Sequence, residues 1–94
     1  PDFTFYIPNA FSPNGDGLND LFIPRLIDAN IVSISIFNRW NSLVFYTENP
    51  NIEWDGSSNG TPCLPGVYAY KIFYKKEGSE SLKQLLGHVS IIRD

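Results

Sequence analysis

The feature that most constrains this chain is a series of short segments in which apolar and polar residues alternate, separated by proline and glycine. The alternation runs through residues 2–7, 31–38 and 66–75. A period of two is the spacing of a β-strand, because successive side chains of a strand point to opposite faces. No segment shows a sustained helical period beside a capping residue. The pattern therefore predicts an all-β fold.

Each candidate strand ends at a proline, a glycine or a polar turn. Within residues 31–38 the alternation places Val32, Ile34 and Ile36 inward and the two intervening serines outward. Residues 39–42 join that strand to the next as a hairpin, and a charged, glycine-containing loop joins the last two strands. Six or seven short strands in 94 residues predict an immunoglobulin-like antiparallel β-sandwich of about seven strands. The predicted strands cover residues 2–7, 20–23, 31–38, 43–47, 66–75 and 84–93.

Length and charge limit what the chain can do. Ninety-four residues, 43% of them hydrophobic, predict one domain spanning residues 1–94. A net charge of −3 argues against binding to nucleic acid or to an anionic membrane surface. No apolar run approaches the roughly 20 residues that a membrane span needs, so we expect no direct membrane insertion. The first residue is not Met and no signal-peptide pattern follows, which suggests a domain excised from a longer chain.

The loop from Asn14 to Asp20 carries the densest group of oxygen ligands. Asn14, Asp16 and Asp20 could supply side-chain oxygens to Ca²⁺, as in the first half of an EF-hand loop. However, Ile23 stands where that loop needs its bidentate glutamate. The Asn-Gly and Asp-Gly pairs also favour tight turns with no metal at all. We favour the structural turn, with a weak Ca²⁺ site as the alternative, and expect no other cofactor.

Two tryptophans and one thiol are the other candidates for function. Trp54 could be a platform for a sugar, but we expect it to be buried as a plug of the sandwich. Trp40, at the predicted hairpin tip, is either folded back on the sheet or offered to a partner. Cys63 and His88 have no spacing that pairs them, and no G-x-S-x-G elbow occurs. We therefore predict no enzyme activity and no small-molecule substrate.

Four blocks of sequence, taken together, resemble a known family. The first reads Ile-Pro-Asn-Ala-Phe-Ser-Pro-Asn-Gly-Asp-Gly-Leu-Asn-Asp at residues 7–20, and the second is the hairpin at residues 34–45. The third runs from Trp54-Asp55-Gly56 to residue 70, and the fourth covers residues 87–93. In this order they resemble the gliding-motility-associated C-terminal domain, the type B sorting domain carried by cargo of the type IX secretion system. One departure is Asn41, which stands where the family usually has glycine in the hairpin turn.

The resemblance implies a noncatalytic sorting signal. It would direct a longer secreted protein through the type IX translocon to the cell surface or outside. Its partners would be that translocon and an outer-membrane partner barrel. The alternative is an immunoglobulin-like adhesion, carbohydrate-binding or Ca²⁺-binding module of a surface protein.

Recognition of such a signal calls for an exposed surface. Residues 84–93 form a strand with few charges or prolines in its middle, so it is a candidate edge for strand addition. Our hypothesis is that the end of this strand and the Trp40 hairpin tip form the recognition surface. The candidate partner-binding residues are Arg39, Trp40, Gly87, His88, Val89, Ile91 and Arg93.

Overall fold

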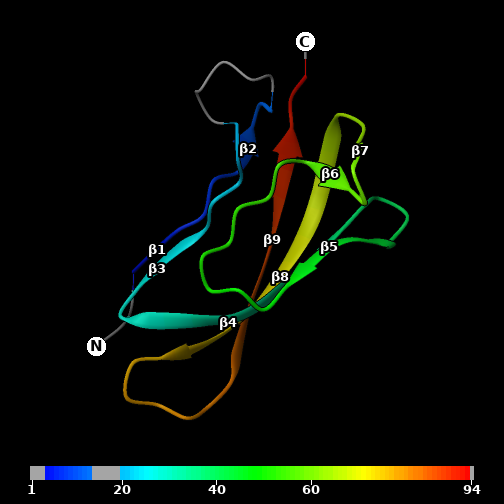
Figure 1. The fold of residues 1–94 in the computed structure, drawn as a ribbon. Helices are drawn as coiled ribbons and strands as arrows, with labels where there is room; N and C mark the ends of the chain where they lie inside the picture. Colours follow the sequence, from blue (N-terminus) through cyan, green and yellow to red (C-terminus); the bar gives the residue numbers. More distant parts are fainter. Residues whose placement is uncertain (1–3, 14–19, 94) are drawn as a thin grey trace.

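The computed structural model describes residues 4–13 and 20–93, and these contain nine strands and no helix (Figure 1). The all-β class is therefore confirmed, whereas the expected number of about seven strands is too low. Three of the nine strands have only two residues each. The strands are β1 (Thr4–Tyr6), β2 (Ala10–Phe11), β3 (Arg25–Ile27), β4 (Ala29–Phe37), β5 (Leu43–Thr47), β6 (Ser57–Ser58), β7 (Thr61–Pro62), β8 (Gly66–Lys76) and β9 (Lys83–Ile91).

A five-stranded sheet in the order β2-β9-β8-β4-β5 is the main layer. Both predicted hairpins, β4–β5 and β8–β9, are present and antiparallel, but β2 pairs parallel to the end of β9. Two small ribbons, β1–β3 and β6–β7, lie apart from the sheet (Figure 1). The turn of β6–β7 is Asn59-Gly60, both with positive φ (52° and 82°). An Asn-Gly pair is the usual signal of such a hairpin, so this ribbon was predictable. No helix among the described residues has the length and apolarity of a membrane span.

The core lies between one face of the sheet and the irregular segments that cross it. β4, β8 and β9 contribute buried aliphatic side chains, and the covering segments contribute Phe22, Ile52 and Trp54, each at most 1% exposed. Two layers packed over a shared apolar interior are the architecture of a small sandwich. The buried sheet residues of this core include Ile34, Ile36, Ile72, Val89 and Ile91.

The predicted alternation in β4 is wrong at its first half. Val32 is exposed and Ser33 is buried, because the register of β4 against β8 shifts between Ile31 and Ser33. This irregularity adds one residue to β4 and reverses the phase of the pattern before it. Ile34 and Ile36 follow the shift and face the core as expected.

The predicted strand at residues 20–23 is also wrong. Only Phe22 makes a bridge there, to Trp54, and the strand β3 begins after Pro24. Proline has no N–H group to continue a ladder, so the chain pairs at Phe22, passes a buried Pro24 and then pairs with β1.

Gly87 in β9 makes room for an aromatic ring. It lies directly opposite Tyr70 of β8, and a Cβ atom at Gly87 would overlap the phenol of Tyr70. The ring also contacts Phe22, with centroids 5.8 Å apart. Tyr70 therefore crosses β9 on the core side, where only glycine leaves it space.

Arg93 ties β9 to the connection between Trp54 and β8. Its Nε donates to the carbonyl of Cys63 at 3.0 Å and its Nη2 donates to the carbonyl of Gly56 at 3.1 Å. Both hydrogen bonds are partly buried and come from a cation, which makes them stronger than neutral pairs. Arg93 thus holds the loop that contains Gly56 and Cys63 close to the end of β9.

Substituting Gly87→Ala tests the space under Tyr70. We expect the free energy of unfolding to fall by about 1 to 3 kcal/mol, because the ring must leave its place over β9. Urea unfolding of the single and double variants with Tyr70→Ala measures this. In the Tyr70→Ala background the added methyl group should cost little. An equal cost in both backgrounds would contradict the explanation.

Substituting Arg93→Ala tests the two hydrogen bonds that Arg93 donates to the loop carbonyls. We expect a loss of about 1 to 3 kcal/mol in urea unfolding, since two carbonyls lose a charged donor. Arg93→Lys should recover only part of it, because lysine lacks the planar fork of donors. Arg25→Ala, at an exposed arginine of β3, is the matched control and should change stability by no more than about 0.5 kcal/mol. An equal loss of unfolding free energy in Arg93→Ala and Arg25→Ala would contradict a stabilising role of the Arg93 hydrogen bonds.

Candidate functional site

The outer edge of β9 is covered at one end and open along the rest. Ser90 N donates to the carbonyl of Asn9 at 2.9 Å and Ile92 N donates to the carbonyl of Phe11 at 3.0 Å. These bonds belong to the short parallel pairing with β2. Among the described residues no strand pairs with this edge from Lys83 to Val89. The open edge therefore lies toward the start of β9, whereas the sequence predicted it at the end of this strand.

The direction of the N–H groups along β9 follows from those two bonds. The register with β8 is continuous from Lys83 to Ile91, so the direction alternates without a break. Since the N–H groups of Ser90 and Ile92 point outward, those of Gln84, Leu86 and His88 do as well. A partner strand laid along this edge would therefore meet three outward N–H groups.

The candidate side chains of β9 are not equally available. Val89 and Ile91 are buried in the core, at 0% and 2% exposure, and Gly87 lies under Tyr70. His88 is exposed on the opposite face of the strand, whereas Arg93 bonds the loop carbonyls described above. Of this group, only His88 offers a side chain to a partner directly.

Several hydrogen bonds close the hairpin tip between β4 and β5. Asn38 Oδ1 accepts hydrogen bonds from the N–H groups of Trp40 (2.9 Å) and Ser42 (3.0 Å). Asn41 N donates to the carbonyl of Asn38, and Asn41 has a φ of 65°. Asparagine tolerates this left-handed conformation better than most residues. The turn therefore forms without glycine at this position.

Trp40 projects from this turn with 68% of its surface exposed. The guanidinium of Arg39 lies 4.9 Å from the centroid of the indole ring, a cation–π geometry. The sequence left open whether Trp40 folds back on the sheet. In the structure it does not. An exposed tryptophan beside an arginine is the composition that protein interfaces favour.

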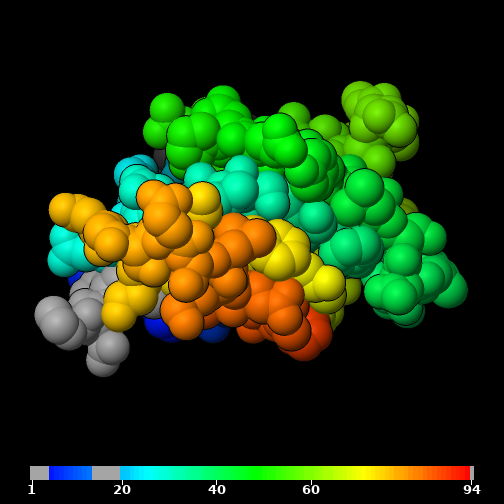
Figure 2. Space-filling model, turned by 90° about the horizontal axis from the view of Figure 1, so that it is seen from below, coloured from blue at the N-terminus to red at the C-terminus, as the bar shows by residue number. Residues whose placement is uncertain are grey.

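A groove with a volume of about 450 Å³ runs beside this tip. Its opposite wall is the stretch from Thr61 to Tyr68, in which Leu64 and Val67 are more than half exposed. Figure 2 shows this end of the molecule as two lobes, the β6–β7 turn and the β4–β5 turn, with a hollow between them. This wall was not among the predicted partner-binding residues. The apolar Leu64-Pro65 pair in a long loop was the available signal.

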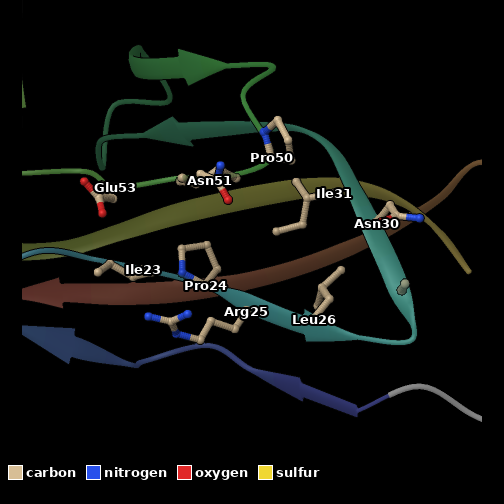
Figure 3. Close-up of a pocket in the computed structure, with 11 residues that line it drawn as sticks. Ile23, Pro24, Arg25, Leu26, Asn30, Ile31, Pro50, Asn51 and Glu53 are labelled. Carbon is tan, nitrogen blue, oxygen red and sulfur yellow. The ribbon is translucent and has the colours of Figure 1, made fainter.

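A second hollow, of about 420 Å³, lies between residues 23–31 and 50–53 (Figure 3). Arg25 and Glu53 are the ionisable residues that line it, and they come from opposite sides. Proline and aliphatic side chains such as Leu26 and Ile31 form much of the rest. No cysteine, histidine or serine is among its lining residues.

The other reactive groups are separate. Burial raises the pKa of the Cys63 thiol, which opposes formation of the thiolate nucleophile. His88 belongs to the exposed face of β9 and Cys63 to the loop held by Arg93. Trp54 is fully buried, as expected for a plug and not for a sugar platform.

The candidate Ca²⁺ loop falls largely outside the described residues. This is the case for Asn14 and Asp16, whereas Asp20 is described and half-buried. Across residues 4–13 and 20–93, no three His, Cys, Asp or Glu side chains gather where they could hold a metal ion. The Ca²⁺ interpretation of the loop stays a prediction.

Comparison with known proteins identifies the kind of domain. The family model described as the CHU_C type IX secretion signal domain matches residues 5–89. No curated protein matches the chain. A domain of this family marks its cargo for export by the type IX secretion system to the cell surface or outside, and nothing in the match supports the adhesion alternative. The chain belongs to the family of CHU_C type IX secretion signal domains.

Proposed function

We propose that this signal is recognised through the open edge of β9 together with the Arg39–Trp40 hairpin tip. The partners are the translocon of the type IX system and an outer-membrane barrel that receives the exported cargo. The observation that carries the proposal is the stretch of β9 before β2, with which no strand of the described residues pairs on the outer side. Family membership supports contact with the secretion system in general, and the specific partners and residues are our inference.

Strand addition suits this edge for two physical reasons. An edge strand presents unpaired main-chain groups that a partner strand can bond, whatever its sequence. Outward N–H groups recur at Gln84, Leu86 and His88, and no proline interrupts them. Leu86, at 66% exposure, and His88 then flank the added strand on one face. Main-chain bonds would supply affinity, and these two side chains would supply part of the specificity.

The remaining candidates of β9 support the edge from behind. Val89 and Ile91 hold the strand on the core, Gly87 admits Tyr70, and Arg93 fixes the loop beyond it. Their substitution would alter recognition by moving the strand. This is a positioning role, different from contact with the partner.

In this proposal residues 1–94 are one sorting domain of a longer secreted cargo. The domain performs no reaction and takes no small-molecule substrate. Support comes from the family, whose members are signal domains, and from the separation of the reactive side chains described above.

Substituting His88→Pro tests strand addition. Proline removes an outward N–H group and leaves the β8–β9 ladder bonded, so the fold should survive as in natural edge strands. We expect export of a reporter that carries an N-terminal signal and this domain to fall several-fold. The measurement is the reporter in the medium and on the cell surface of a bacterium with the type IX system.

His88→Ala is the matched control, because it removes the same side chain but keeps the N–H group. Leu86→Pro and Leu86→Ala repeat the comparison one step along the edge. Thermal unfolding of each purified domain shows whether it is folded. Normal export of folded proline variants would refute strand addition at this edge.

A further inference from the structure

The groove beside Trp40 has walls that are held in place before anything binds. Tyr68 donates its hydroxyl to the carbonyl of Leu64 at 2.7 Å, which fixes the loop that forms one wall. Arg93 holds the neighbouring Cys63 carbonyl, and Asn38 holds the opposite hairpin turn. A site ordered in advance loses less entropy on binding than a flexible one. The groove is thus fit to receive a ligand without rearrangement.

The lining of the groove is mainly apolar, and its volume lies within the range of ligand sites. Trp40, Leu64 and Val67 line it and are each more than half exposed. Exposure of such side chains along one hollow is typical of interaction sites. Two of its polar side chains, Asn38 and Tyr68, already bond main-chain groups of the walls, which favours an apolar peptide side chain over a sugar. The apolar and aromatic lining residues are Trp40, Val44, Pro62, Cys63, Leu64, Pro65, Val67 and Tyr68.

The charge of the groove differs from that of the whole chain. Arg39 lines it, and none of its lining residues is an aspartate or a glutamate, although the chain carries a net charge of −3. The guanidinium already lies over the Trp40 ring and keeps donors for a carboxylate. The groove is therefore complementary to an apolar group next to a negative charge.

We propose that this groove, formed by the Arg39–Trp40 tip and residues 61–68, binds an extended peptide segment of the secretion machinery. The segment places an aromatic or aliphatic side chain against Trp40 and Tyr68, and an aspartate or glutamate beside Arg39. This inference rests on the proposed function, recognition by protein partners. It deepens that function by adding the groove wall at residues 61–68 to the hairpin tip and by naming the chemistry of the ligand.

Selection from a random dodecapeptide library displayed on phage, with the 94-residue chain as bait, tests the groove. Wild type should enrich peptides with an aromatic or aliphatic residue next to Asp or Glu. Trp40→Ala should weaken binding of the synthetic winners by about tenfold or more, as for an interface hot spot. Arg39→Glu should reverse the selection, so that lysine or arginine replaces the acidic residue.

Two matched variants control for surface changes away from the groove. Tyr46→Ala removes an exposed aromatic ring of β5, and Arg25→Glu reverses an exposed arginine beside the other hollow. Both should select the same peptides as wild type. Thermal unfolding shows that all four variants are folded. Loss of selection in the controls, or none in the Trp40 and Arg39 variants, would overturn the proposal.

A glycan array distinguishes the other class of ligand. Glycan binding that is lost in Trp40→Ala, with no peptide enriched by wild type, would overturn the peptide proposal, and so would no binding in either assay.

Export of the reporter separates this inference from the proposed function. If His88→Pro blocks export but Trp40→Ala and Arg39→Glu do not, the groove is not used while the β9 edge stands. Loss of export in the groove variants, with peptide selection as expected, supports the groove whatever the edge variants do.

Discussion

The packing of Trp54 is the interaction on which the rest of the structure depends. Its main chain exchanges two hydrogen bonds with Phe22, at 2.8 and 3.1 Å, and its indole N–H donates to the carbonyl of Ser57 at 2.9 Å. Its ring contacts Phe11, Phe45 and Tyr68, with centroids 5.5 to 6.0 Å apart. These bonds hold two irregular segments against the sheet, although neither segment is a strand. Trp54 therefore links both covering segments to the sheet, and its packing stabilises the second layer.

The elements that sequence could predict are those with local signals. The β4–β5 and β8–β9 hairpins each combine alternating strands with a short polar turn, so both strands and their pairing followed from neighbouring residues. The shift at Val32 could not be predicted, because an extra residue in one strand depends on the register of its partner. The pairing of β2 with β9 was also hidden. It joins two residues to a strand some 80 positions away, and a segment that short has no period of its own.

The location of the candidate site stays a prediction, and the structure adds which of its residues are exposed. Sequence indicated the last strand and the Trp40 tip, and the structure describes both as accessible in part. The polar–apolar alternation of residues 88–91 indicates which face of β9 meets the core, yet the exposed His88 and the buried Val89 were both predicted to contact the partner. The groove wall around Leu64 was missed because loops that lie far apart in sequence form it together. Such a surface follows from tertiary packing and has no local pattern.

The last strand links folding to recognition. β9 contributes Val89 and Ile91 to the core, and Arg93, two residues beyond it, holds the loop that forms one wall of the groove. Pairing of β9 with β8 forms the open edge, and Arg93 and Tyr68 bond the carbonyls of the loop that forms one wall of the groove. One set of contacts therefore creates both proposed surfaces at once. An unfolded chain presents neither of these proposed surfaces. A partner could therefore recognise them only on a folded domain.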